Sequence, residues 1–174
     1  IYVGGLFRGR GIEIILDTFA KLDSKYHIIF MGYGELEDKI KSYQIGFSNI
    51  HFHPAVNPNM VIKYTQTADI GIALIENICL SYYFCLPNKV FEYLLSEIPM
   101  IVSNFPEMGR LIDNYGFGWK VDVDQSSLFQ LVNSINQNTL EQKKKNISTA
   151  KDNFGWHIEE ETFLDVYKNV LKIK

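Results

Sequence analysis

The sequence has few cysteines, and their spacing excludes the usual roles of paired thiols. Cys79 and Cys85 are the two cysteines among 174 residues, and "LSYYF" separates them. This spacing fits neither a zinc knuckle nor a redox Cys-x-x-Cys pair, and two cysteines do not form a disulfide framework. We therefore interpret both as buried thiols.

The sequence also lacks long apolar runs and long blocks of like charge. No apolar run reaches the roughly 18 to 20 residues that a membrane span needs, and the N-terminus has no signal-peptide pattern. The net charge is −3, and no block of like charge exceeds the three lysines at 143–145. These features argue against a nucleic-acid surface and predict a cytoplasmic protein. Because the chain opens inside a strand-like run without an initiator methionine, we expect a piece of a longer protein.

Short β-rich runs alternate with helix-length segments. A content of 47% hydrophobic and 21% charged residues is ordinary for one globular domain. Between the β-rich runs, apolar residues recur at spacings of three and four, which is typical of helices with one buried face. After residue 124 the pattern is helical only, with breaks predicted near Thr139 and at "NFGW". Six strands are predicted, at residues 1–5, 26–32, 49–53, 69–75, 99–103 and 118–123.

This alternation predicts an α/β fold with a Rossmann-like parallel six-stranded sheet and helices on both faces. Parallel strands joined by helices require right-handed crossovers, and such sheets bind ligands at the carboxyl ends of their strands. The functional residues are therefore expected in the strand-to-helix loops.

The first such loop, "GGLFRGRGIE", combines glycines with two arginines. Gly4 and Gly5 let the backbone approach a ligand, and the helix that follows attracts anions at its N-terminus. Arg8 and Arg10 add guanidinium groups, which suit phosphate because they donate paired hydrogen bonds. A flexible turn with solvated arginines is the alternative interpretation of this loop alone.

The second loop, "GYGELEDK", is a weaker candidate. Gly32 and Gly34 form a Gly-x-Gly turn, but Glu37 stands where a dinucleotide fingerprint needs its third glycine. Taken alone, the turn favours an architectural role.

The third loop ends in "LPNKVFE" and predicts an anion-binding helix start. Pro87 suits the first turn of a helix and leaves the amides of Asn88, Lys89 and Val90 facing outward. Glu92, in the next turn, could accept hydrogen bonds from ribose hydroxyls. All three loops follow strands and should converge at one edge of the sheet.

These motifs, in this order, resemble the C-terminal half of a GT-B glycosyltransferase of family 4, a large retaining family. "VGGLFRGRGIE" resembles the family's "vGrl…KGi", and "FMGYGELE" resembles its "ivGdGpe". "IHFHPAV", "YTQTADIGIAL" and "LPNKVFEYLLSEIPMIVS" are similar to the next three family motifs, and "GRLIDNYGFGWKV" and "FGWHIEEETFLDVYKNVL" to the last two. Residues 1–174 are thereby identified as a single C-terminal donor-binding domain, without the N-terminal acceptor domain.

The resemblance implies a role for each matching residue. Arg10 matches a lysine that grips the donor diphosphate, with Arg8 beside it, so both are implied as catalytic. Glu92 matches a glutamate that binds ribose, and the segment after the third strand borders the base. The implied donor-binding residues are Gly4, Gly5, Gly32, Gly34, Pro54, Ala55, Val56, Leu86, Pro87, Asn88, Lys89, Val90 and Glu92.

Two positions depart from the family pattern. Gly5 stands where the family has an arginine, for which Arg8 could substitute. Phe84 stands where the first glutamate of the Glu-x7-Glu motif contacts the donor sugar. Glu76 lies in the same loop and could lend a carboxylate. Without an Asp-x-Asp motif we expect no metal and no cofactor.

The resemblance also implies the partners. They are a nucleotide-sugar donor, with UDP favoured over GDP, and a glycan or lipid-linked acceptor held by the N-terminal domain. A lipid-linked acceptor would be compatible with peripheral membrane association of the full-length protein. We do not expect nucleic acid as a partner. We expect the isolated domain to bind nucleotide without transferring sugar.

Three other interpretations stay open. One is a non-catalytic nucleotide-binding or scaffolding α/β module, which the departures at Gly5 and Phe84 favour. Another is an enzyme similar to UDP-sugar 2-epimerases, whose own motif set is not visible. A flavodoxin-like or receiver-type domain would need an acidic cluster at the strand ends, and none is evident.

Overall fold

The computed structural model describes residues 1–171, apart from the side chains of Trp156 and His157. Its strands are β1 (Tyr2–Gly5), β2 (Ile28–Tyr33), β3 (Ile50–Pro54), β4 (Gly71–Ala73), β5 (Met100–Ser103) and β6 (Gly118–Val121). Each lies within, or within one residue of, a predicted β-rich run.

Helices separate the strands and follow the last one. The first group is α1 (Ile12–Phe19), α2 (Glu37–Gly46), α3 (Val61–Thr65), α4 (Leu80–Tyr83), α5 (Asn88–Leu95) and α6 (Pro106–Tyr115). The C-terminal group is α7 (Gln125–Ser134), α8 (Gln137–Ala150) and α9 (Trp156–Leu171). Two 3-10 turns, Pro58–Met60 and Lys151–Asn153, complete the elements of the described chain.

The strands form two parallel sheets of three strands each, in the orders β1-β2-β3 and β4-β5-β6. Within them, Val3 lies opposite Met31, and Ile72 lies opposite Ile101. Because the β1 and β4 edges face each other, the strand order reverses there, as it does at the switch point of doubly wound folds.

The prediction of one six-stranded sheet is wrong, and the reason is a side chain between β1 and β4. Ile72 N donates to Ile1 O at 2.8 Å, which is the first bond of a parallel ladder. The next bond would join Val3 N to Ile72 O, but the Tyr93 hydroxyl stands between them. It accepts from Val3 N at 3.2 Å and donates to Ile72 O at 2.9 Å. The phenol thus takes the place of the ladder bond.

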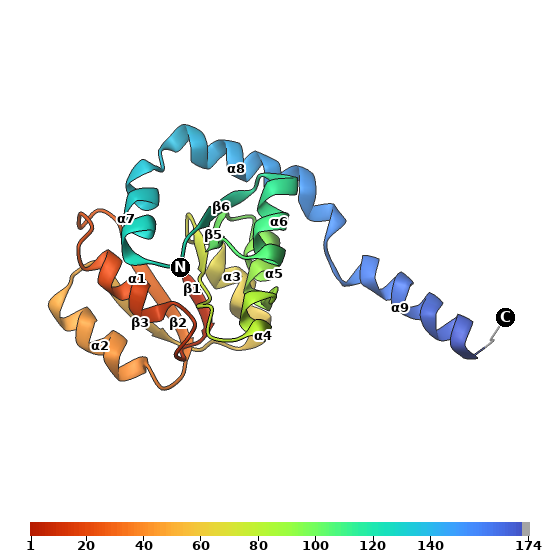
Figure 1. Cartoon of the computed structure of the whole chain (residues 1–174), viewed down its shortest axis with the longest axis horizontal. Helices are drawn as coiled ribbons and strands as arrows, with labels where there is room; N and C mark the ends of the chain where they lie inside the picture. Colours follow the sequence, from red (N-terminus) through yellow and green to blue (C-terminus); the bar gives the residue numbers. More distant parts are fainter. Residues whose placement is uncertain (172–174) are drawn as a thin grey trace.

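Helices cover both faces of the sheets (Figure 1). Alternate strand residues enter different cores, as the two-residue period of a strand requires. The core under α1 and α7 receives Tyr2, Phe30, Ile72 and Ile101. The core under α5 and α6 receives the next residue of each strand, namely Val3, Met31, Ala73 and Val102.

The C-terminal helices differ in one boundary from the prediction. The break expected near Thr139 lies earlier, because Asn136 caps α8 and Thr139 N donates to its side chain at 3.0 Å. The break at "NFGW" is confirmed, and α9 begins there and extends away from the body of the molecule (Figure 1). Residues 172–174 of the predicted helical tail lie outside the described residues.

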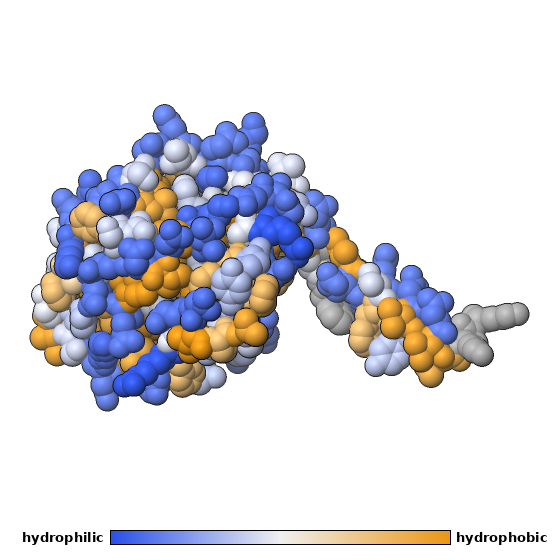
Figure 2. All heavy atoms as spheres, in the orientation of Figure 1, coloured by the Kyte–Doolittle hydropathy of each residue, from blue (hydrophilic) through white to orange (hydrophobic). Residues whose placement is uncertain are grey.

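One side of α9 is apolar and exposed. Figure 2 shows hydrophobic residues gathered along this helix. They include Ile158, Leu164, Val166, Tyr167, Val170 and Leu171. No helix within residues 1–171 is long and apolar enough to span a bilayer.

Tyr93→Phe tests the role of the phenol between the sheets. The substitution keeps the ring but leaves Val3 N and Ile72 O buried without their partner, so we expect the free energy of unfolding to fall by about 1–3 kcal/mol. Urea denaturation measures the loss. Tyr43→Phe is the control, because the Tyr43 hydroxyl bonds Asp17 at an exposed position, and we expect it to change stability much less. Equal losses in the two variants would contradict this account.

Candidate functional site

The loops predicted to carry function lie at the carboxyl edge of the two sheets. All strands within each sheet are parallel. The segments after β1, β2 and β3 therefore share the carboxyl edge of the first sheet, and those after β4, β5 and β6 share the carboxyl edge of the second. The hydrogen bonds described next join the two groups of loops across the gap between β1 and β4.

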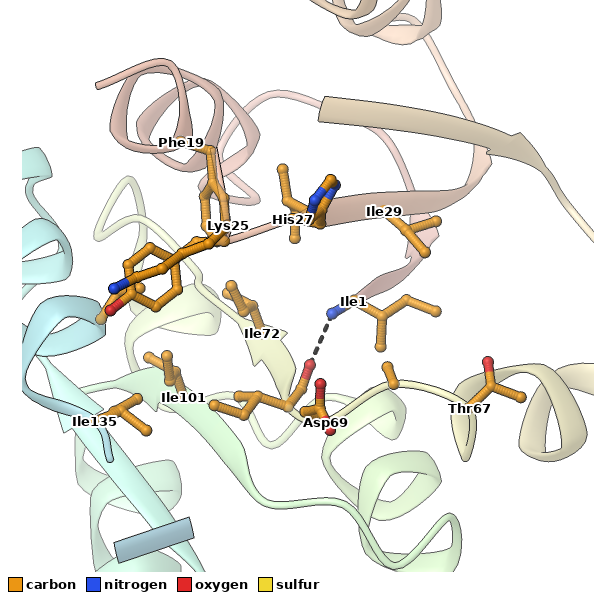
Figure 3. Close-up of a pocket in the computed structure, with 15 residues that line it drawn as sticks. Ile1, Phe19, Lys25, His27, Ile29, Thr67, Asp69, Ile72, Ile101 and Ile135 are labelled. Atoms are coloured by element: carbon orange, nitrogen blue, oxygen red, sulfur yellow. Dashed lines mark hydrogen bonds between the residues drawn. The ribbon is translucent and has the colours of Figure 1, made fainter. Parts of the chain in front are cut away.

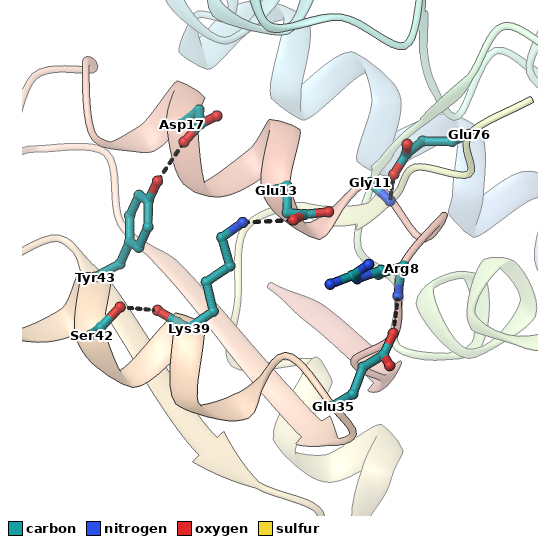
Figure 4. Close-up of polar contacts among 9 residues, drawn as sticks. All are labelled: Arg8, Gly11, Glu13, Asp17, Glu35, Lys39, Ser42, Tyr43 and Glu76. Atoms are coloured by element: carbon teal, nitrogen blue, oxygen red, sulfur yellow. Dashed lines mark hydrogen bonds and ion pairs between the residues drawn. The ribbon is translucent and has the colours of Figure 1, made fainter.

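Glu76, in the loop after β4, forms two hydrogen bonds with the loop after β1; Figure 4 shows the one to Gly11. Its carboxylate accepts from Gly11 N at 3.2 Å, and its own amide donates to Gly9 O at 2.9 Å. Gly11 caps α1 with a φ of 68°, and a side chain there would collide with Leu74. The carboxylate therefore occupies the N-terminus of α1. The suggested role of Glu76 toward a donor sugar stays untested.

The two candidate arginines have different surroundings. Arg8 is exposed, and its backbone amide donates to Glu35 Oε1 at 3.0 Å (Figure 4). Arg10 is half-buried, and its guanidinium carbon lies 4.6 Å from the centroid of the Tyr82 ring. Stacking of this kind favours a guanidinium and holds it in place. The loop thus fixes Arg10 at the edge and leaves Arg8 in solvent.

Lys89 is the most unusual residue at this edge. Its side chain leaves the first turn of α5 and is only 8% exposed, and its Nζ atom lies 3.4 Å from the centroid of the Tyr2 ring. The buried Nζ has no hydrogen-bond partner. Burial first, and then the positive charge of Arg10, lower the pKa of Lys89 well below its usual value. Glu92 and Cys85 act in the opposite direction.

The start of α5 has free backbone donors. Pro87 is its N-cap and provides no side-chain cap, and no acceptor is described for the amides of Asn88 and Lys89. Val90 N donates to Pro87 O at 3.0 Å, so the third amide is already taken. Two of the three predicted amides are therefore available to an anion.

Glu92 lies in the next turn of α5 and is half-buried. Burial raises the pKa of its carboxyl group, and the neighbouring charge of Lys89 opposes that rise. Leu86, just before the helix, is also half-buried and packs against the core under α5.

The glycines of the second loop are explained by close packing of β1 on β2. A Cβ atom at Gly32 would lie 1.8 Å from Gly4 O, and one at Gly34 would lie 2.4 Å from Leu6 O. Glu37 caps the turn by accepting from Gly34 N at 3.0 Å, which lowers the pKa of Glu37. These contacts require glycine whether or not a ligand binds, so the role predicted for Gly32 and Gly34 in donor binding stays a prediction.

The remaining predicted residues lie in two exposed segments. Pro54 ends β3, Ala55 follows it in solvent, and Val56 packs against the core. Phe84 is the C-cap of α4, is 54% exposed and contacts the Tyr83 ring edge-on. Nothing in the structure assigns a ligand to either segment.

An apolar cavity of about 300 Å³ lies at the opposite edge (Figure 3). Ile1, His27, Ile72 and Ile101 line it from the amino ends of β1, β2, β4 and β5. Lys25 lines it, but neither the arginine loop nor the start of α5 does. A second cavity, of about 320 Å³, lies at the carboxyl edge beside Glu76, Asn104 and Asp122.

The prediction that both cysteines are buried thiols is wrong, because Cys79 is exposed and Cys85 is half-buried. Within the described residues, no group of three or more His, Cys, Asp and Glu side chains could hold a metal ion. The described histidines instead contact one another or aromatic rings. His27 Nδ1 lies 2.9 Å from His51 Nε2, and the His53 ring lies against Tyr64.

Comparison with known proteins identifies the family. The sequence model of the family described as "Glycosyl transferases group 1" matches residues 1–138. The chain belongs to this family. A search of curated proteins found no match.

Solved structures of glycosyltransferases share the fold of this group 1 chain. WaaG, a glycosyltransferase involved in lipopolysaccharide biosynthesis, is 14% identical with a TM-score of 0.70, over 95% of this chain and 45% of WaaG. Anabaena HepE in complex with UDP is 14% identical with a TM-score of 0.71, over 96% and 48%. Sucrose-phosphate synthase from Thermosynechococcus elongatus is 15% identical with a TM-score of 0.74, over 99% and 45%. The chain thus spans less than half the length of these proteins.

Sequence reasoning missed three contributors to this site. It assigned Lys89 only a backbone amide, whereas its side chain is buried beside Tyr2. It also missed the Tyr82 ring against Arg10 and the Glu76 bond to Gly11. The spacing of Lys89 and Tyr93, four residues apart on one helix face, was a signal that Lys89 is directed inward.

Lys89 makes the stability of the folded chain depend on pH. Its pKa is lowered in the folded chain, whereas the unfolded chain keeps a value near 10.5. Between these values the unfolded chain binds more protons, so we expect the free energy of unfolding to rise as the pH increases toward the unfolded value near 10.5. Lys89→Met, which keeps the length of the side chain, should lack this contribution.

The comparison uses urea denaturation at several pH values. At about pH 7 we expect Lys89→Met to be more stable by about 1 kcal/mol, because the cost of an unpartnered buried amine exceeds its attraction to the Tyr2 ring. This advantage should shrink as the pH rises. The control is Lys143→Met, since Lys143 is also next to an aromatic ring, with its Nζ 5.7 Å from the centroid of Trp119, but is only partly buried. Identical pH slopes in wild type and Lys89→Met would contradict the lowered pKa.

Proposed function

We propose that this chain is the donor-binding half of a glycosyltransferase and that it binds a nucleoside-diphosphate sugar, with UDP as the favoured nucleotide. The observation that carries the proposal is the grouping of Arg10, the buried Lys89 and the free amides at the start of α5 at one edge of the fold. Cations and helix N-termini at the carboxyl edge of a parallel sheet bind phosphate groups.

In this proposal each part of the donor meets a different segment. The diphosphate lies against Arg10 and the amides of Asn88 and Lys89. The ribose hydroxyls bond Glu92, and the base borders Pro54 to Val56. Support comes from Anabaena HepE, whose similar fold was solved with UDP and with UDP-glucose.

The chemistry assigned to this half is stabilisation of the leaving group. As the bond between sugar and diphosphate breaks, negative charge grows on the departing phosphate oxygen. Fixed positive groups aimed at that oxygen lower the barrier, because they gain attraction as the charge develops. Arg10 is held on the Tyr82 ring for this task. Arg8, being exposed, is assigned a secondary role.

The acceptor and the stereochemistry belong to the whole enzyme. We propose that the other half binds a glycan or lipid-linked acceptor and that transfer retains the anomeric configuration. This chain alone then binds donor but transfers no sugar. The cytoplasmic location and the absence of metal and cofactor stay predictions.

A non-catalytic nucleotide-binding module is the second candidate. The exposed Phe84 at the position of the sugar-contacting glutamate favours it. Such a module would bind nucleotide equally with and without the sugar, whereas a donor site should distinguish UDP from UDP-sugars.

Calorimetric titration with UDP, GDP and ADP tests the proposed function. We expect one nucleotide to bind without added metal, and Arg10→Ala and Glu92→Ala each to weaken binding about tenfold or more, since each removes a charged hydrogen bond. The control is Lys21→Ala, an exposed cation bonded to Gln125 at the end of α1, which should leave affinity unchanged. If the folded wild-type chain binds none of the three nucleotides, the proposal is wrong.

A further inference from the structure

The ε-amino group of Lys89 is buried, and no group in the described part of the fold accepts its hydrogen bonds. The residue is more than nine-tenths buried, and its Nζ lacks any hydrogen-bond partner. A buried ammonium needs three acceptors, and leaving them unmade is costly. The Tyr2 ring, 3.4 Å away, offers only a weak cation–π attraction. A structural lysine would be expected to meet a carboxylate or carbonyl oxygen here.

Lys89 also lies near a second cation. The charge of Arg10 acts on Lys89 in the unfavourable sense, because both groups are positive. Glu92 acts favourably, but it forms no ion pair with Lys89. A bound polyanion would offset the repulsion between Arg10 and a protonated Lys89, so this pair of groups suits a ligand of high negative charge.

The position of Lys89 places its amine at the end of the gap between the two sheets. Val90 and Tyr93 of α5 pack in one core, whereas Tyr2, which the amine contacts, belongs to the other. The Cε atom of Lys89 lies 4.0 Å from where a Cβ on Gly4 would be. The amine is therefore directed at the turn after β1, where the strand order reverses and doubly wound folds bind ligands.

Position 5 cannot supply a cation from the neighbouring turn. A Cβ atom on Gly5 would lie 2.8 Å from the Phe7 ring, so the ring fills the space that a side chain would enter. The arginine implied there by the family resemblance is absent, and the Phe7 ring stands in its path. The Cε atom of Lys89 lies 4.0 Å from where a Cβ on Gly4, the residue before Gly5, would be.

Resting on the proposed function, we propose that the Lys89 side chain binds the donor diphosphate as the second cation beside Arg10, in place of the arginine missing at Gly5. When the donor binds, the neutral Lys89 amine takes up a proton and becomes an ammonium. The proton comes from the solvent and stays on Nζ while the diphosphate is bound.

The proton uptake follows from the groups that face Lys89. Arg10 of the first loop and burial against Tyr2 of β1 favour the neutral amine, whereas Glu92 of α5 and Cys85 before it favour the ammonium. In the free chain the first set prevails and lowers the pKa. A bound diphosphate adds negative charge at the same place, which raises the pKa again.

Calorimetry in two buffers of different ionisation enthalpy measures the proton uptake directly. At a pH between the lowered pKa of Lys89 and its usual value near 10.5, we expect the wild-type chain to take up a fraction of one proton for each UDP bound. Inorganic pyrophosphate is the second probe, because it tests the phosphate site without the base. Lys89→Met should weaken binding of both ligands about tenfold to a hundredfold and abolish the uptake.

The outcomes separate this inference from the proposed function. If the wild-type chain binds neither UDP nor pyrophosphate, both proposals fail. If it binds them and Lys89→Met binds equally well with the same proton uptake, the Lys89 inference fails alone. Lys143→Met is the matched control and should behave as wild type. If Lys89→Met loses both stability and binding, Lys89 is a structural residue and the inference is overturned.

Discussion

The Tyr93 hydroxyl between β1 and β4 determines how the rest of this molecule is arranged. It accepts from Val3 N and donates to Ile72 O, so one phenol replaces a ladder bond and joins the two sheets. Gly71 is required beside it, because a Cβ there would lie 2.4 Å from the Tyr93 ring. Since Tyr93 is fixed, α5 is fixed, and Lys89 one turn earlier is directed at the carboxyl end of the gap.

The position of α5 brings positive groups together at the carboxyl edge, and their mutual repulsion is unfavourable when no ligand is bound. The Tyr82 ring holds Arg10, the Tyr2 ring contacts Lys89, and Glu76 keeps the first loop in place. The free amides of α5 add partial positive charge to the same place. Binding sites commonly retain such destabilising features, because the ligand supplies the missing charge.

Sequence patterns predicted the order and type of the elements well, because apolar periodicity reports directly on burial. In β1, Tyr2 enters one core and the next residue, Val3, enters the other; Ile72 and Ala73 do the same in β4. Strands covered on both faces therefore have continuous apolar sequences. The single sheet was predicted wrongly, because periodicity does not reveal a side chain inserted between two strands. The helix break near Thr139 was misplaced because the Asn136 cap lies three residues before its partner.

The candidate site was predicted in part. The glycine turns, Arg10 and the Pro-Asn-Lys helix start are local patterns, and local patterns are visible in sequence. The burial of Lys89 depends on Tyr2, which is 87 positions earlier in the chain, and on the Phe7 ring near Gly5. Contacts between distant segments of this kind follow only from the packed structure.

The most direct test of the central claim is a crystal structure of this chain with UDP. The account predicts the diphosphate at the carboxyl edge, with its oxygens within hydrogen-bond distance of Arg10, Lys89 Nζ and the Asn88 amide. UDP bound in the apolar cavity at the amino edge, or bound at the carboxyl edge with no phosphate oxygen within hydrogen-bond distance of Lys89 Nζ, would contradict it.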